Sequence, residues 1–140
     1  MTEYKLYIAE TLIRVFAGIL FFFQGYDKLF KIKMRGVIDT FMADASRRNI
    51  SRPVVSIIAY YTSLVEFFGG LLLVFGLFST YTLLALGVDL LFVAFAFSFL
   101  EPMWDLKHVF PRFILVILLL ILPIEQNIFS IDYLINLKLK

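Results

Sequence analysis

Residues 54–78 read VVSIIAYYTSLVEFFGGLLLVFGLF, and this stretch decides the fold. It carries a single charged residue, Glu66, and is longer than the roughly 20 mostly apolar residues that a helix needs to cross a bilayer. Three further apolar stretches lie at about residues 12–30, 81–100 and 109–124. The sequence therefore predicts an integral membrane protein with four spans.

The composition of the whole chain supports the same class. Hydrophobic residues make up 61% of the 140 residues, seventeen residues are Phe, and the mean hydropathy is +0.91. A water-soluble domain of this size could not cover so much apolar surface. The length suffices for a single domain over residues 1–140, and we predict an all-α, four-helix transmembrane bundle.

The polar stretch between the first two spans, about residues 31–53, carries its own periodicity. Its apolar residues recur at helical spacing, and polar residues occupy the other side. This pattern predicts a short amphipathic helix lying at the level of the lipid headgroups. Its apolar face comprises Val37, Ile38, Phe41, Met42 and Ala45, and its polar face comprises Asp39, Thr40, Asp44, Arg47 and Arg48.

The sequence also excludes several functions. The net charge of +2 is too small to indicate a nucleic-acid partner. The chain has no Cys and one His, which excludes thiol chemistry, thiolate-bound zinc and a bis-histidine haem within one copy. We find no convincing metal cluster, and the exposed segments are too short to build a catalytic domain. We therefore expect a protein that is not catalytic on its own.

Basic residues are concentrated in the loop after the first span and in the loop after the third. The termini and the second loop carry few. The positive-inside rule then places the first and third loops in the cytoplasm and both termini outside. The first span reads as a retained helix rather than a cleaved signal, because Glu3 and Glu10 interrupt the expected positive region. Anionic lipid is the simplest partner of the basic loop, and a docked protein is the alternative.

Three ionisable residues lie inside the spans, and they are the main clue to function. Glu66 is about 18 Å from either end of its span, Asp89 is similarly central, and Arg14 lies on the outer side of the midplane. Each belongs to a stripe of small residues, which is typical of packed membrane helices. We therefore expect Arg14, Glu66 and Asp89 to meet inside the bundle. The stripes are Arg14, Gly18, Phe21, Gly25, Lys28; Thr62, Glu66, Gly69, Leu73, Gly76; and Thr82, Ala85, Asp89, Phe92, Ala96.

Two interpretations of these charges remain open. Arg14 could pair with one acid and set the helix register. Alternatively, two acids against one base leave a negative charge that must be protonated, hydrogen-bonded or matched by a ligand, which indicates a cofactor or proton site. Gln24 and Lys28 lie near the cytoplasmic interface, where Lys28 would extend toward the headgroups with Asp27 as its local partner. Arg112 is interpreted as a headgroup anchor.

The stretch from residue 14 to 30, RVFAGILFFFQGYDKLF, and the stretch from 66 to 82, EFFGGLLLVFGLFSTYT, resemble the DoxX family of small four-span bacterial membrane proteins. The first has an Arg, a Gly four residues later, and then Gly and Lys at the helix end. The second has a Glu, a Gly pair and a later Gly. A late Ser-Ile-Asp is similar to the Ser-Leu-Asp of the family. The matching positions are Arg14, Gly18, Gly25, Lys28, Glu66, Gly69, Gly70, Gly76 and Ser130, Ile131, Asp132.

The resemblance implies a four-helix membrane fold and an association with redox complexes. We therefore interpret the chain as a multi-pass subunit of the bacterial inner membrane that supports a redox complex and holds a quinone-like molecule between helices. The candidate ligand-binding residues are Arg14, Gln24, Lys28, Glu66 and Asp89. A small proton-coupled carrier and a purely structural subunit are the alternatives. The expected partners are the lipid bilayer and a protein of the complex, and a homo-oligomer remains open.

Overall fold

The computed structural model describes residues 2–100, 109–122 and 128–138, and these ranges contain helices and turns but no strands. The all-α class is thereby confirmed. Helix α1 continues into a short π-helix, η1, and α2 into a 3-10 turn, η2. The elements are α1 (Thr2–Tyr26), η1 (Asp27–Lys31), α2 (Lys33–Ala45), η2 (Ser46–Arg48), α3 (Arg52–Phe75), α4 (Ser79–Leu100), α5 (Phe110–Ile121) and α6 (Ile131–Lys138).

Three of these helices are long and apolar enough to cross a membrane. They are the continuous segment Tyr4–Lys31, α3 and α4. The first helix begins ten residues before the predicted span, at Thr2. The fourth predicted span, 109–124, corresponds to α5, whose 12 residues extend only about 18 Å. The chain is a multi-pass membrane protein with three full-length candidate spans and one shorter apolar helix among its described residues.

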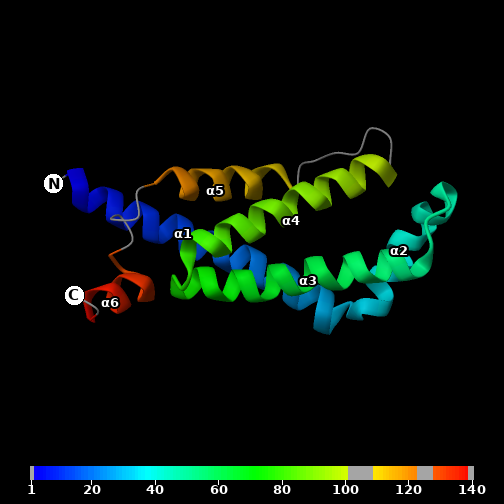
Figure 1. The fold of residues 1–140 in the computed structure, drawn as a ribbon, viewed down its shortest axis with the longest axis horizontal. Coiled ribbons are helices and arrows are strands. Elements are labelled where there is room, and N and C mark those ends of the chain that lie inside the picture. The colour runs from blue at the N-terminus through cyan, green and yellow to red at the C-terminus, as the bar shows by residue number, and fades with distance from the viewer. Residues whose placement is uncertain (1, 101–108, 123–127, 139–140) are drawn as a thin grey trace.

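The helices lie roughly along one axis, as Figure 1 shows, with α3 and α4 forming an antiparallel hairpin. Helix α1 packs mainly against α3, and its contacts concentrate on the second half of that helix. Helix α2 continues beyond the end of α1 and packs against the first half of α3. Helix α5 contacts both α4 and α1. The start of α1 and helix α6 lie at the same end of the molecule (Figure 1).

Glycines allow α1 and α3 to approach closely. A Cβ at Gly25 would overlap the backbone of Phe67, and one at Gly70 would overlap the backbone of Phe22. At Gly18 a Cβ would lie 2.8 Å from the backbone nitrogen of Val74. The stripe predicted on α1 therefore contacts α3 through Gly18 and Gly25. On α3 the contact is made by Gly70, whereas Gly69 of the predicted stripe faces Leu86 of α4. Close approach at small residues is the usual way in which membrane helices pack without a hydrophobic driving force.

The turn between α3 and α4 is held by the C-terminal segment. Helix α3 ends at Gly76, whose φ of 64° is left-handed. The carboxylate of Asp132 accepts hydrogen bonds from the backbone N–H of Phe78 and of Ser79, both at 2.8 Å. Asp132 thus caps the start of α4, where an anionic group is favourable. The turn spans residues 76–78, earlier than the gap at residues 79–80 between the two predicted spans.

The amphipathic helix predicted between the first two spans exists as α2. Its apolar face is buried by protein, because Val37 and Ile38 pack against Val55 and Ala59 of α3. The polar residues Asp39 and Thr40 are exposed on its opposite face. The helix and its two faces are as predicted, whereas its location at the headgroup level stays a prediction.

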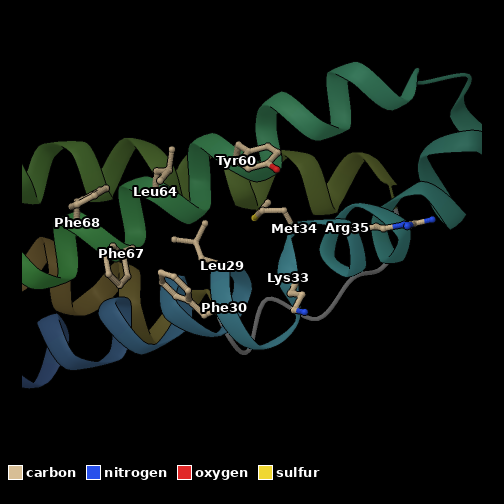
Figure 2. Close-up of a pocket in the computed structure, with 9 residues that line it drawn as sticks. All are labelled: Leu29, Phe30, Lys33, Met34, Arg35, Tyr60, Leu64, Phe67 and Phe68. Carbon is tan, nitrogen blue, oxygen red and sulfur yellow. The ribbon is translucent and has the colours of Figure 1, made fainter.

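A sharp break separates the end of η1 from α2 and leaves an open groove beside α3. Lys33, at the break, has a left-handed backbone with φ 62°. The groove has a volume of about 540 Å³ and is bounded by η1, the start of α2 and the middle of α3 (Figure 2). Its lining residues are Leu29, Phe30, Lys33, Met34, Arg35, Tyr60, Leu64, Phe67 and Phe68.

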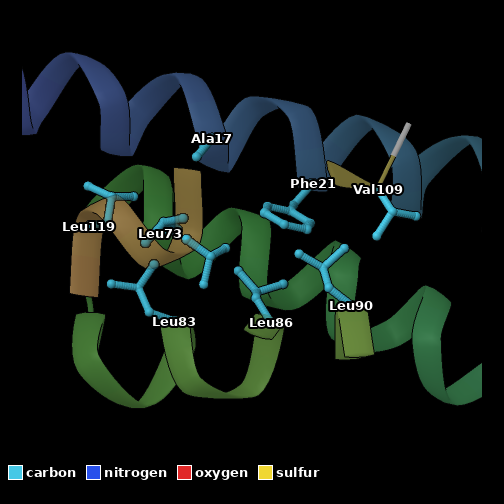
Figure 3. Close-up of a cluster of buried hydrophobic side chains, with 9 residues drawn as sticks. Ala17, Phe21, Leu73, Leu83, Leu86, Leu90, Val109 and Leu119 are labelled. Atoms are coloured by element: carbon cyan, nitrogen blue, oxygen red, sulfur yellow. The ribbon is translucent and has the colours of Figure 1, made fainter. Parts of the chain in front are cut away.

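The main apolar core lies among α1, α3, α4 and α5. Phe21 of α1 and Leu73 of α3 are fully buried, and they pack with side chains of α4 and α5 (Figure 3). The predicted stripe on α4 is partly wrong, because Ala85 and Phe92 are exposed. The core of α4 is formed instead by Leu83, Leu86 and Leu90. Helix α4 is apolar on all sides, so its hydropathy pattern cannot identify the packed face.

Candidate functional site

The clearest polar feature inside the protein is an ion pair between Lys28 and Glu66. The Nζ of Lys28 lies 2.6 Å from Oε2 of Glu66, and the Glu66 side chain is fully buried while that of Lys28 is 19% exposed. Lys28 belongs to the π-helical end of the first span, and Glu66 lies near the middle of α3. Lys28 therefore points inward rather than toward the headgroups. The sequence-based expectation that it pairs with Asp27 is wrong, since Asp27 pairs with Lys31.

Asp89 of α4 lies within electrostatic range of this pair. Its side chain is fully buried, and it interacts electrostatically with Glu66, Lys28 and Arg112. Glu66 also interacts with Lys28 and Arg112. We call these four residues, Lys28, Glu66, Asp89 and Arg112, the interior charge cluster. It joins η1, α3, α4 and α5, with two acidic and two basic side chains.

Arg112 is the member that sequence reasoning missed. It was interpreted as a headgroup anchor because it lies near the start of the predicted fourth span. In the structure it is half-buried and interacts with both carboxylates. Its position could have indicated an interior partner, because Arg112 lies three residues inside an apolar stretch, where a charged residue usually has such a partner. With Arg112, the interior charge cluster has two basic side chains for its two acidic ones, whereas the sequence prediction had two acids against one base.

Several oxygens of the cluster have no hydrogen-bond partner within the described ranges. They are Oε1 of Glu66 and both carboxylate oxygens of Asp89, together with Oγ of Ser63, which lies one turn before Glu66 on α3. Leaving a buried acceptor unsatisfied costs about 1–3 kcal/mol, and more when it is charged. A proton or a hydroxyl-bearing ligand would satisfy these oxygens. The unsatisfied groups mark the centre of the candidate site.

The predicted partnership of Arg14 with Glu66 or Asp89 is wrong. The Nε of Arg14 donates to Glu10 at 2.9 Å, and both side chains are almost completely buried. Its two terminal nitrogens donate to backbone carbonyls of Leu73, Val74 and Phe129, at 2.9, 3.1 and 3.1 Å. Leu73 and Val74 lie in the last turn of α3, and the carbonyl of Leu73 also accepts from the backbone N–H of Gly76. Arg14 therefore holds α1, α3 and the segment before α6 together.

Gln24 lies one turn before Lys28 on α1 and is half-buried. The structure thus brings Lys28, Glu66 and Asp89 together and assigns Arg14 to a separate cluster. A role for any of these residues in ligand binding stays a prediction.

The cluster can act in two chemical ways. Paired carboxylates in a low-dielectric interior can accept or release a proton, and adjacent bases can stabilise the ionised form. The same groups can hold a polar head, with Lys28 and Arg112 as donors and the carboxylates as acceptors. A ligand or proton would reach the interior charge cluster at Lys28, because the Lys28 side chain is partly exposed while Glu66 and Asp89 are fully buried.

A comparison with known protein families matches most of the chain. The profile of the DoxX family matches residues 9–99, which include most of α1, all of α2 and α3, and nearly all of α4. This range contains Lys28, Glu66 and Asp89 but not Arg112 or Asp132. Comparison with curated proteins and with solved structures gives no significant match. The matched range carries the Arg, Gly and Glu pattern of α1 and α3, the two helices that pack closely against each other. The chain belongs to the DoxX family.

Proposed function

We propose that the protein is an accessory subunit of a membrane redox complex, in which the interior charge cluster binds the polar head of a quinone-like molecule. The observation that supports this proposal is the set of buried, unsatisfied carboxylate oxygens on Glu66 and Asp89. The hydroxyl groups of a quinol would donate to these oxygens. The carbonyls of the oxidised form would accept hydrogen bonds from Lys28 and Arg112.

Asp89 distinguishes this proposal from a purely structural role. An ion pair that only sets helix register needs one hydrogen-bonded basic partner, and Lys28 supplies it to Oε2 of Glu66 at 2.6 Å. Neither oxygen of Asp89 has such a partner among the described residues. A fully buried acid without a hydrogen bond is destabilising unless something else compensates. A ligand that bonds to Asp89 supplies that compensation.

The chain itself offers binding and positioning rather than electron transfer. Its two long aromatic helices, α1 and α3, present Phe and Tyr side chains to the lipid phase, where quinones dissolve. In proteins that use organic redox cofactors, the protein orients the cofactor and tunes its surroundings. Electrons would then pass to the partner protein of the complex.

We predict that Asp89→Asn lowers the amount of quinone retained by the purified protein by at least about tenfold, since it removes a charged acceptor worth about 1.5–3 kcal/mol. The protein is reconstituted in nanodiscs with a short-chain menaquinone, and bound quinone is extracted and quantified. Glu66→Gln should lower retention as well.

The matched control is Asp39→Asn, which removes an acid that is 52% exposed and paired with Arg52 on the surface. It should leave quinone retention unchanged. Folding of each variant is checked by helical circular dichroism. Unchanged retention in a folded Asp89→Asn variant would contradict the proposed function.

A small proton-coupled carrier is the second candidate, and the break after α1 favours it. The π-helical segment Asp27–Lys31 and the left-handed Lys33 interrupt the helix directly beside the Lys28–Glu66 pair. Broken helices next to buried ionisable groups are typical of secondary transporters. This role predicts proton uptake into proteoliposomes that Asp89→Asn abolishes, whereas a quinone-binding subunit would show no such flux.

We also propose a location in the bacterial inner membrane, with α5 completing a fourth crossing and both termini outside. An even number of crossings puts the start of α1 and helix α6 on one side, and Figure 1 has them at one end of the molecule. The exposed basic residues Arg47 and Arg48 favour a cytoplasmic side for the opposite end.

The orientation predicts which engineered cysteines react in intact cells. The chain has no Cys, so single substitutions are unambiguous reporters. An impermeant maleimide should label Tyr4→Cys from outside and should label Ser46→Cys only after the cells are lysed. Tyr4 is 61% exposed and Ser46 is also exposed, so both sites are accessible. Labelling of Ser46→Cys in intact cells would reverse the orientation.

A further inference from the structure

The groove beside α3 is separate from the interior charge cluster, and its chemistry differs. None of the four cluster residues lines it. Its floor and walls are mainly apolar and aromatic, formed by residues that include Leu64, Phe67 and Phe68 of α3. Phe30 and Phe68 are each 55% exposed at its edges, so the groove opens onto the surface that faces acyl chains.

Two positive charges, Lys33 and Arg35, lie at one end of this groove. In Figure 2 their charged ends point away from the apolar floor and in different directions. Both residues are exposed, and neither forms an ion pair within the described ranges. No acidic residue lines the groove. The end formed by the start of α2 therefore carries an uncompensated charge of +2.

Lys33 and Arg35 differ from the other basic residues between positions 31 and 52. Lys31 pairs with Asp27, Arg47 with Asp44, and Arg52 with Asp39. Arg48 lies over the ring of Phe99, at 5.6 Å. The unpaired charge of the segment is thus concentrated where the apolar groove begins. The left-handed backbone of Lys33, which is uncommon for a residue other than Gly, places that side chain at the rim.

We propose that this groove is a binding site for one anionic phospholipid of the surrounding bilayer. The headgroup phosphate lies at the end of the groove that carries Lys33 and Arg35, and one acyl chain lies along Leu64, Phe67 and Phe68. Basic pockets between membrane helices on the cytoplasmic side recognise anionic headgroups by the same combination of charge and apolar contact. The proposal is independent of quinone binding, because the two sites share no residue.

The test compares two lipids with identical acyl chains, phosphatidylglycerol and phosphatidylcholine, by native mass spectrometry of the detergent-purified protein. Wild-type protein should retain phosphatidylglycerol in preference. The double variant K33Q/R35Q should reduce that preference by about 30-fold, because each basic residue near an anionic lipid contributes about 1 kcal/mol. Equal retention of the two lipids by wild-type protein would overturn the proposal.

The matched control is K31Q/R47Q, which removes the same charge from the same segment at residues that are 69% and 81% exposed and paired elsewhere. This control variant should keep the preference for phosphatidylglycerol. If both double variants lose the preference equally, the protein attracts anionic lipid through its overall charge rather than through a site.

Leu64→Trp tests the acyl-chain position, since it fills the groove without altering charge. It should lower retention of phosphatidylglycerol, and unchanged retention would contradict an acyl chain in the groove.

Discussion

Replacing Arg14 with methionine is expected to lower the free energy of unfolding by about 3–5 kcal/mol. The change removes the guanidinium group that lies 2.9 Å from the carboxylate of Glu10, which is 1% exposed. It also removes the donors that satisfy carbonyls of Leu73, Val74 and Phe129. The measurement is loss of helical circular dichroism as the mole fraction of sodium dodecyl sulfate is raised in a mild detergent.

Arg47→Met is the matched control for Arg14→Met. Arg47 also pairs with an acid on its own helical segment, at 3.5 Å, but its side chain is 81% exposed. Exposed pairs contribute about 0–1 kcal/mol, so this variant should unfold close to the wild-type midpoint. If both variants unfold at the same midpoint, Arg14 does not connect α1, α3 and the C-terminal segment as described.

Replacing Lys28 with methionine is the second change with a large expected effect, again about 3–5 kcal/mol. Glu66 is fully buried and would lose the ammonium group that lies 2.6 Å from Oε2. A second substitution, Glu66→Gln, should restore part of the lost stability, because it removes the uncompensated charge. The four variants of this cycle, measured by the same detergent titration, yield the coupling energy of the pair.

Lys31→Met is the control for Lys28→Met. Lys31 lies three residues further along the same π-helical segment and pairs with Asp27 at 2.9 Å, but it is 69% exposed. Water and salt screen that pair, so its loss should change stability by less than about 1 kcal/mol. Equal stability of the Lys28 and Lys31 variants would mean that Glu66 does not need Lys28.

The class of the protein and most of its helices could be predicted from the sequence. The apolar stretch around Glu66 and the one ending near residue 100 have the required length and composition, and both form long helices. The amphipathic pattern after the first span correctly predicts α2. Helix formation depends on neighbouring residues, and insertion into the membrane depends on the transfer of side chains out of water. Both can be read from the composition and periodicity of a single segment.

The candidate site could be predicted only in part. Buried positions for Glu66 and Asp89 followed from the cost of placing charges in lipid. Their basic partners did not follow, because Arg14, Lys28 and Arg112 were all compatible with the sequence. Helix α1 is offset along α3, so that Gly25 meets Phe67 and Lys28 reaches Glu66. That offset is set by close packing of glycines between two helices.

The sequence by itself determined that this chain is an all-helical membrane protein of the DoxX family with acidic groups in its interior. Hydropathy and the glycine pattern are properties of each segment alone, and they carry that conclusion. Only the tertiary structure decided that Arg14 pairs with Glu10 and that Lys28 and Arg112 face the interior acids. Charge pairing depends on the relative depth and rotation of different helices. Packing between helices sets their relative depth and rotation. Because α4 is apolar on all sides, its local sequence pattern does not predict either quantity.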